Sequence, residues 1–465
     1  MKSLNKLQAA LLFLIVLSLQ SCFVAKDYKR PEIVEEDYFR TDKLEQDSLT
    51  MADVSWRELF TDPVLVGHIE EGLKNNIDIR TAIQQILIAE AYVKQGKASF
   101  FPSVNANAQI THQELSSNSQ FGSFFSSLDQ FELSSNISWE ADIWGKIRSN
   151  KRAFEASYLR SVAAHRAVKT QLIASIASTY YQLLALDEQI RITEETIENR
   201  NNSVEATKAL KRAGNVTEVG VIQTEAQFYT AQAILVDLKK QLRLLENTFS
   251  ILLGDEPREI ERSELQAQQI ETELNVGVPV QLLRNRPDVM AAEYNLINSF
   301  ELTNVAKSNF YPSLTLTANV GFQSLDIAEL IDPNSLFATI IGGLTQPVFN
   351  ARRIRTEYEV SEAEQVQAQL NFRQTFITAS KEVSDALYTY EAATEKIEIK
   401  QREYEAYNTA TNYSEQLLNN GLANYLEVLT ARENALNTQL DLINARFNQL
   451  SSIVDLYQAL GGGWQ

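Results

Sequence analysis

The stretch IASTYYQLLALDEQIRITEETIENRNNSV, residues 176–204, decides the fold of this chain. A large apolar side chain recurs in it at every seventh position: Ile176, Leu183, Ile190, Ile197 and Val204. A strict seven-residue repeat is typical of long helices in coiled-coil-like contact. The stretch lies inside 147–253, a segment without proline whose only glycines are Gly214 and Gly220. The pattern therefore predicts an unbroken helix up to Gly214.

A second proline-free segment, 351–460, repeats the first after 207 positions. This shift superimposes Gly214 on Gly421 and Leu253-Gly254 on Leu460-Gly461. The seven-residue step also recurs, at Val383, Tyr390, Ile397, Tyr404, Thr411 and Leu418. Each copy is therefore predicted to be a helical hairpin with a glycine at its tip. The expected helices are 147–213 and 217–253, then 351–420 and 424–460. At 1.5 Å per residue the first would be roughly 100 Å long.

Each copy is expected to open with an amphipathic helix, 62–96 in the first copy and 288–309 in the second. A proline lies at the start of each, Pro63 and Pro287, as is common at the start of a helix. Two segments per copy then alternate apolar and polar residues, as strands with one dry face do. The expected strands are 102–111 and 131–141, then 312–323 and 336–346. Their lengths match tilted membrane strands of roughly 9–11 residues. An ordinary soluble sandwich sheet remains the alternative for this pattern.

Four membrane strands cannot close a ring, and open edges in lipid leave backbone groups unpaired at several kcal/mol each. Other chains must therefore complete the sheet, and three chains would supply twelve strands. Small and polar residues between the apolar positions, such as Ala174 and Ser175, suit helices that form a hollow wall. A solid dimeric or trimeric bundle has the same periodicity and stays open at this point.

The first 21 residues have the pattern of a secretory signal, with Lys2 and Lys6 before an apolar run. Cys22, the only cysteine, follows Leu19-Gln20-Ser21, which resembles a bacterial lipobox. We expect Cys22 to carry diacylglycerol and a further acyl chain such as palmitate, and multiple chains make such an anchor stable. Phe23 is not the aspartate associated with inner-membrane retention, so the outer membrane is the expected destination. A non-lipidated signal with an incidental cysteine is the alternative.

Composition argues against several classes of function. The chain has 42 Lys and Arg against 60 Asp and Glu. Losing the two signal lysines would leave 40 against 60, a net charge of −20, which disfavours nucleic acid. The three histidines, His68, His112 and His165, lack metal-ligand spacing, and no catalytic motif is evident. We therefore expect no enzymatic activity, no catalytic or metal site, and no cofactor besides the lipid.

Several phrases resemble the TolC-like outer-membrane factor family, in particular its lipid-anchored efflux branch (OprM/NodT-like). They are WRELFTDP at 56–63, EADIWGKIR at 140–148, VPVQLLRNRPDVMAAE at 278–293 and ALGGGW at 459–464. The resemblance spans nearly the whole mature chain, and the Leu-Leu-x-x-Arg-Pro-Asp pattern within the third phrase is the most specific. Within that layout we expect a signal peptide at 1–21, a lipid-anchored extension at 22–55, repeat 1 at 56–254, a linker at 255–286 and repeat 2 at 287–465.

The resemblance implies a mainly α-helical protein with a membrane β-barrel part: a homotrimer with a twelve-stranded barrel and an α-helical periplasmic tunnel. Its function would be the outer-membrane exit duct of a tripartite efflux system. It would passively transport small molecules, such as drugs, from a periplasmic adaptor and an inner-membrane pump of the resistance-nodulation-division type. A duct for type I-like protein secretion and a lipid-anchored structural coiled-coil protein are the alternatives.

The resemblance also suggests where such a tunnel closes, near the hairpin tips marked by Gly214 and Gly421, where an adaptor would dock. Glu427 occupies an acidic constriction position of the family. The family often has a second acid three residues later, but Thr430 stands there and leaves a double ring open. In the first copy the equivalent place is Gly220, so Glu218 is the weaker candidate. A solvated glutamate on an exposed turn is the alternative for both.

Overall fold

The structure of the chain, a computed structural model, describes residues 24–32, 50–120, 122, 124, 126–268, 275–277, 279–423 and 425–464. It comprises two compact units. Unit 1 contains residues 1–32, 86–161 and 292–372, and unit 2 contains 33–85, 162–291 and 373–465. The units cut across the two sequence repeats, because each repeat contributes its strands to unit 1 and its helical hairpin tip to unit 2.

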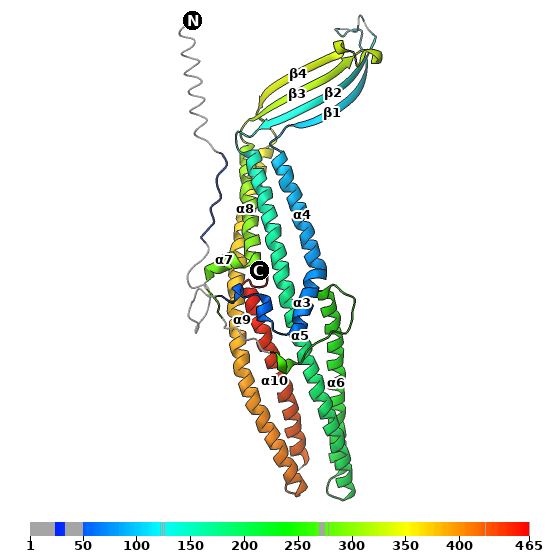
Figure 1. Ribbon diagram of the computed structural model, residues 1–465, viewed down its shortest axis with the longest axis vertical. Coiled ribbons are helices and arrows are strands. Elements are labelled where there is room, and N and C mark those ends of the chain that lie inside the picture. The colour runs from blue at the N-terminus through cyan, green and yellow to red at the C-terminus, as the bar shows by residue number, and fades with distance from the viewer. Residues whose placement is uncertain are drawn as a thin grey trace. The chain divides into compact units, whose positions relative to one another are not determined.

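The sheet of unit 1 has four antiparallel strands in the order β1-β2-β3-β4 (Figure 1). They are β1 Ser103–Glu114, β2 Ser127–Ala141, β3 Ser313–Ser324 and β4 Leu336–Thr345. The first hairpin is longer than the alternation predicted, since β2 begins at 127 instead of 131. The additional residues are mostly polar and gave no apolar signal, yet they pair in register with the end of β1, from Ser127 opposite Glu114 to Gln130 opposite Thr111.

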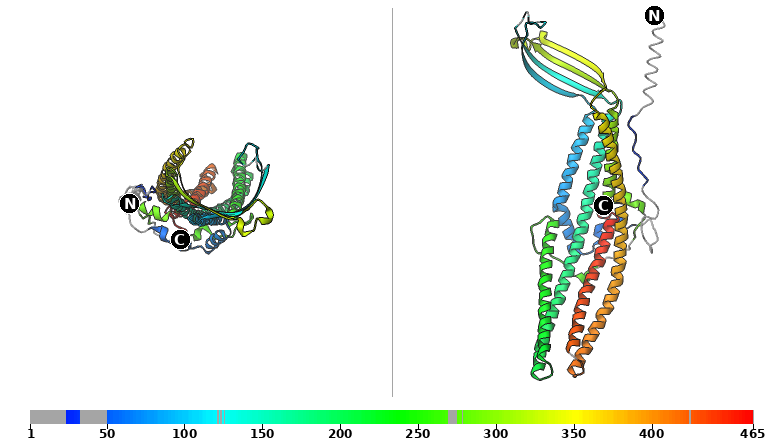
Figure 2. Two further views of the ribbon diagram at one scale, coloured as in Figure 1. Left: turned by 90° about the horizontal axis from the view of Figure 1, so that it is seen from above. Right: turned by 180° about the vertical axis from the view of Figure 1, so that it is seen from behind.

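The sheet is curved (Figure 2), and one of its faces carries exposed apolar side chains. Val104 and Ile110 of β1 point to the same face as Ile340 of β4, and all three side chains are more than half exposed. Among the described residues, β1 and β4 each pair with a strand on one side only. The sheet of one chain therefore has an uncovered apolar face and two open edges.

The helices of unit 1 pack beside the strand ends. They are the end of α4 (Ile77–Ala98), the start of α5 (Lys146–Arg212), most of α8 (Pro287–Ser308) and the start of α9 (Arg353–Asn419). Tyr92 of α4 stacks on Phe154 of α5, with ring centroids 5.6 Å apart. The Trp144 indole stacks on Tyr311 and donates from Nε1 to the Pro312 carbonyl oxygen at 2.8 Å. Aromatic side chains thus fix the junction between β2, α5 and β3.

Unit 2 consists mainly of two helical hairpins. Most of α5 pairs with α6 (Glu218–Leu253), and most of α9 pairs with α10 (Tyr425–Ala459), as Figure 1 shows. The seam predicted from the seven-residue step is buried at Ile176, Leu183, Val204 and Val383. No helix among the described residues combines the length and apolarity needed to cross a membrane. The short elements are η1 Met51–Asp53, α2 Trp56–Leu59, α3 Pro63–Asn75, η2 Leu265–Ala267, η3 Pro279–Gln281 and α7 Leu282–Asn285, with η4 Ile327–Glu329 and η5 Pro333–Ser335 in unit 1.

The single opening helix predicted over 62–96 is wrong, because the chain breaks at Asn76 between α3 and α4. The Asn76 carboxamide oxygen accepts hydrogen bonds from the backbone N–H groups of Asp78 at 2.9 Å and Ile79 at 3.2 Å. Its amide nitrogen donates to the Leu252 carbonyl oxygen at 2.9 Å. A buried asparagine that caps one helix and ties it to another favours a break over a continuous helix.

Candidate functional site at the hairpin tips

Both predicted tip glycines end their helices in the same way. Gly214 has φ +82° and Gly421 has φ +69°, in the left-handed region that glycine favours. After Gly214 the Asn215 N–H donates to the Leu210 carbonyl oxygen at 3.0 Å, and after Gly421 the Leu422 N–H donates to Leu417 at 2.8 Å. These bonds are those of Schellman caps, which reverse the chain directly after a helix. Figure 2 shows both tips at the same end of unit 2.

Glu427 lies in the first turn of α10, six residues after the tip glycine. Its side chain is exposed, whereas the next two residues, Val428 and Leu429, are buried at 1% and 4% exposure. Within the described part of the chain, no hydrogen bond or ion pair involves the Glu427 carboxylate. The carboxylate therefore points away from the packing seam and is free to face a lumen or a neighbouring chain.

Glu218 differs from Glu427 in having a partner. It lies in the first turn of α6, and its carboxylate forms an ion pair with the Lys211 ammonium in the last turn of α5. The pair connects the two helices across the turn that contains Gly214. Much of the Glu218 charge is consequently compensated locally, which makes it the weaker candidate for an acidic constriction.

A second set of tip contacts was not anticipated from the sequence. In the first hairpin, Lys208 of α5 pairs with Glu225 of α6 at 3.1 Å. In the second, Glu415 of α9 pairs with Arg432 of α10 at 2.5 Å. The shift of 207 positions superimposes Lys208 on Glu415 and Glu225 on Arg432, so the same pair occurs twice with its charges exchanged. That alignment is the sequence signal that could have revealed it.

Arg432 also connects the two hairpins of unit 2, because its guanidinium donates a hydrogen bond to the Ser203 hydroxyl of α5. Gln227 of α6 reaches the same region of α10 and donates to the Glu433 carboxylate at 3.2 Å. Near the tips, Arg432 and Gln227 therefore connect the second hairpin to the first, a short distance from Glu427 along α10.

We predict that Glu427→Ala raises closed-state conductance and weakens block by multivalent cations in planar bilayers. Three symmetry-related carboxylates at a narrow mouth attract cations, and the substitution removes all three. Glu218→Ala is the matched comparison and should change cation block less, because Lys211 already compensates that carboxylate. Unchanged conductance and block in Glu427→Ala would place this side chain on the outer surface.

The exchanged charge pair gives a second prediction. Arg432→Glu alone should place two carboxylates together and speed amide hydrogen exchange over 415–432, at a cost of about 1 kcal/mol for this half-exposed pair. Adding Glu415→Lys recreates the arrangement of the first hairpin and should restore most of the protection. A double variant that exchanges as fast as the single one would show that the pair does not hold this hairpin closed.

The predicted lipidation site, Cys22, lies outside the described residues, so its acylation stays a prediction. The described chain begins at Val24, and the segment 24–32 is fastened to α8 within unit 1. The Arg30 guanidinium makes two bonds to the buried Glu293 carboxylate, at 2.6 and 2.7 Å. The Asn304 amide exchanges two hydrogen bonds with the backbone of Lys26, at 3.0 and 3.1 Å. A segment that begins two residues after Cys22 is thus fixed to the protein.

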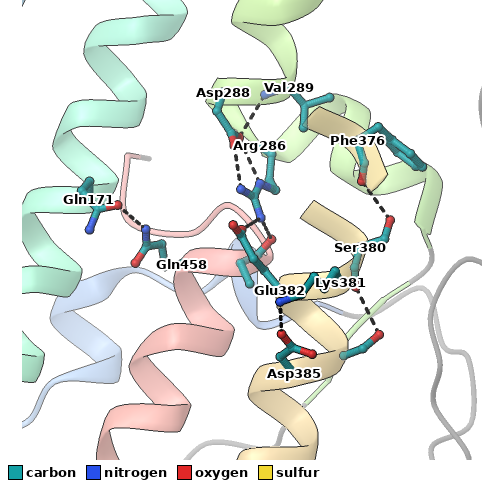
Figure 3. Close-up of polar contacts among 12 residues, drawn as sticks. Gln171, Arg286, Asp288, Val289, Phe376, Ser380, Lys381, Glu382, Asp385 and Gln458 are labelled. Carbon is teal, nitrogen blue, oxygen red and sulfur yellow. Dashed lines mark hydrogen bonds and ion pairs between the residues drawn. The ribbon is translucent and has the colours of Figure 1, made fainter. Parts of the chain in front are cut away.

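The most specific phrase, LLRNRPD at 282–288, forms a charge cluster around the buried guanidinium of Arg286 in unit 2 (Figure 3). The Arg286 guanidinium donates to both Asp288 oxygens at 2.6 and 3.0 Å, to Glu382 at 2.6 Å and to the Ala459 carbonyl oxygen at 3.0 Å. Burial alone would lower the pKa of Arg286, but the two carboxylates outweigh it and raise that pKa.

The C-terminal phrase ALGGGW packs against the same cluster. The Trp464 indole donates to the Asn285 carbonyl oxygen at 2.9 Å. At Gly461 (φ +91°) a Cβ atom would lie 2.4 Å from that oxygen, so no larger residue fits without displacing the backbone. The two phrases, far apart in sequence, therefore form one contact that joins α7 to the end of α10.

Two of the histidines, His68 and His112, have ordinary partners. His68 is buried, with Nε2 2.8 Å from the Glu261 carbonyl oxygen, and His112 Nδ1 lies 2.6 Å from Asp129. The described residues contain no group of three or more His, Cys, Asp or Glu side chains arranged to hold a metal ion.

Comparison with known proteins gives concordant results. The sequence profile of the family described as "Outer membrane efflux protein" matches residues 68–255 and 278–462. The chain is 27% identical over 459 residues to the cation efflux system protein CusC of Escherichia coli O6:H1, covering 97% of this chain and 98% of CusC. It is 27% identical over 457 residues to the solvent efflux pump outer membrane protein SrpC of Pseudomonas putida, covering 97% of each.

Solved structures agree with this result. The outer-membrane channel OprN superimposes with a TM-score of 0.87 at 23% identity, covering 95% of this chain and all of OprN. A CusC structure gives a TM-score of 0.84 at 26% identity, covering 94% and 99%. The fold predicted from the sequence, a helical tunnel with a membrane barrel part, is therefore confirmed, as are the efflux function, the trimeric assembly with an adaptor and a pump, and the outer-membrane location. The chain belongs to the outer membrane efflux protein family.

Proposed function

We propose that this chain is a passive exit duct without enzymatic activity, and that its cargo consists of small toxic molecules, organic compounds included, delivered by a pump and adaptor. Members of its family are passive channels. The observation that carries the proposal is the sheet of unit 1, which has an exposed apolar face and two open edges. Such a sheet suits a lipid-embedded ring made from several copies, and a scaffold protein has no use for it.

The charge of the chain bears on the cargo. With 60 acidic against 42 basic residues, the duct is expected to favour neutral and cationic solutes over anionic ones. The relatives carry names for different cargoes, cations for CusC and solvents for SrpC. We infer that the pump selects the cargo and that the duct contributes a path with a charge preference.

The test is a susceptibility profile of a strain that lacks this gene. Deletion is expected to sensitise cells to the compounds exported by the partner pump, and deletion of both genes to be no worse than deletion of the pump alone. Cationic drugs, neutral solvents, copper and silver salts and an anionic detergent distinguish the cargo classes. Unchanged susceptibility together with loss of a secreted protein would favour the secretion duct instead.

A further inference from the structure

We propose that, in the trimer, β4 extends beyond Thr345 and pairs antiparallel with β1 of a neighbouring copy in one defined register, in which Val348 lies opposite Val104. The inference rests on the exit duct proposed above and adds the residue pairing between neighbouring copies. It follows from a repeat relation that the sheet of a single chain reveals.

Two strand pairings inside the chain, β1 with β2 and β3 with β4, are equivalent in the two repeats. Ser103 pairs with Ser138 between β1 and β2, and Ser313 pairs with Thr345 between β3 and β4. The same side-chain contact marks both, since each serine hydroxyl donates to the carbonyl oxygen of its partner residue at 3.3 Å. From these pairs β3 is β1 shifted by 313 − 103 = 210 positions, and β4 is β2 shifted by 345 − 138 = 207.

The pairing of β2 with β3 then predicts how β4 pairs with β1 of a neighbouring copy. A neighbouring β1 should lie against β4 as β3 lies against β2. Ala141 of β2 pairs with Leu314 of β3. Adding 207 to a β2 position gives the equivalent β4 position, so Ala141 corresponds to 141 + 207 = 348. Subtracting 210 from a β3 position gives the equivalent β1 position, so Leu314 corresponds to 314 − 210 = 104. Val348 is therefore expected opposite Val104 of the neighbouring copy. The same operation on the pair Ile137 and Ala318 places Leu344 opposite Ala108.

The lengths of the strands agree with this register. The last three residues of β2, 139–141, extend past the partner of Ser103 and pair with β3 alone. Their counterparts are 346–348, which follow the end of β4 at Thr345 in the single chain. Val348 is 99% exposed and Val104 is 64% exposed. We infer that β4 ends early because its partner is another copy, and that both valines become covered when that copy is present.

Pro347 fits the same register. The Ser138 carbonyl oxygen faces β1, as its contact with Ser103 shows. Backbone groups two residues apart in a strand point to the same side, so those of Glu140 also face the β1 side, away from β3. Pro347 is the β4 counterpart of Glu140, so its backbone groups would face β3 of the same chain, away from the neighbouring copy. The missing N–H of proline therefore costs no hydrogen bond at the seam, whereas Gln346 and Val348 present theirs to the neighbouring strand.

The side-chain pattern limits the alternatives. The proposed register aligns the apolar face of β4, with Ile340 and Leu344, and the apolar face of β1, with Val104 and Ile110. A slip of one residue would place Asn105 and Gln109 on the lipid-facing side. A slip of two residues preserves the faces, so it is the competing register that an experiment must exclude.

Cysteine cross-linking distinguishes these registers. Directly opposite residues of an antiparallel pair have Cα atoms about 4.5–5.5 Å apart, within the range for a disulfide. Residues displaced by two positions lie beyond about 7 Å and should not be bridged. We expect Val348→Cys with Val104→Cys to give covalent trimers after mild oxidation of outer membranes, visible on a non-reducing gel and lost on reduction.

The matched control is Val348→Cys with Ala106→Cys, which should give at least about tenfold fewer covalent trimers because a two-residue displacement exceeds disulfide reach. The single variant Val348→Cys should give none. Native mass spectrometry of each variant in detergent reports assembly separately. Cross-linking only through Ala106 would overturn the register, and assembled trimers that cross-link through neither position would overturn the pairing of Val348 with Val104. A monomer by mass spectrometry would instead refute the trimeric duct itself.

Discussion

Replacing Arg286 with methionine is expected to lower the free energy of unfolding by about 1–3 kcal/mol, chiefly because the buried Ala459 carbonyl oxygen loses its hydrogen-bond donor. Arg286 is 7% exposed and its guanidinium contacts Asp288, Glu382 and the Ala459 carbonyl oxygen. Without it two carboxylates lose their counter-charge and the end of α10 loses its bond to α7. Thermal unfolding of the detergent-solubilised protein, followed by circular dichroism, measures the effect.

Two variants make the result interpretable. Arg286→Lys keeps the charge but loses the planar fork that binds Asp288 through two bonds, so it should fall between wild type and Arg286→Met. Glu382→Gln should cost less than about 1 kcal/mol, because that side chain is 45% exposed. An Arg286→Met protein as stable as wild type would show that the cluster does not hold the C-terminal segment.

Asp62→Ala is expected to cost about 3 kcal/mol. Asp62 is buried, and one carboxylate oxygen accepts the Val64 N–H at 2.9 Å as the N-cap of α3. The other accepts the Tyr180 hydroxyl and the Gln268 amide, both at 2.8 Å. The loss combines an N-cap, about 0.5–2 kcal/mol, with a buried donor left unpaired, about 1–3 kcal/mol. Asp62→Asn retains acceptor capacity and should cost less.

The same residue predicts a pH dependence. Burial would raise the pKa of Asp62, but the hydrogen bonds from Tyr180, Ser263, Val64 and Gln268 outweigh it and lower that pKa. Its stabilising contribution is therefore fully present above the unfolded value of about 3.9 and is lost as the pH falls through the lower folded value. Wild type should lose more stability than Asp62→Ala between pH 5 and 2. Equal losses in the two proteins would show that Asp62 does not titrate in this way.

The sequence predicts the long elements because their signals are local. Absent prolines, tip glycines and a seven-residue step define the hairpins, and α5 was expected at 147–213 and observed at Lys146–Arg212. Alternation likewise predicts the strands where one face is apolar. It fails at 127–130, where the residues are mostly polar and only cross-strand pairing reveals the strand. Asn76 was missed for a similar reason, because its helix-breaking role depends on Leu252, far away in sequence.

The site could be predicted in position but less well in contacts. The family resemblance predicts Glu427 near the second hairpin tip, and the structure places its exposed side chain in the first turn of α10. The pairing of Glu218 with Lys211 and that of Glu415 with Arg432 depend on how two helices meet, which periodicity alone does not specify. Whether Glu427 lines a constriction stays a prediction, because that depends on three chains converging.

The central claim is that three copies form one hollow duct, with strands in the membrane and helical hairpins that enclose a lumen. Electron cryo-microscopy of the full-length protein purified in detergent tests it most directly. The account predicts particles with threefold symmetry, a ring of twelve strands within the detergent belt and an open lumen running between the helices towards the tips at Gly214 and Gly421. A monomer, or a symmetric bundle whose helices meet on the axis along their whole length, would contradict it.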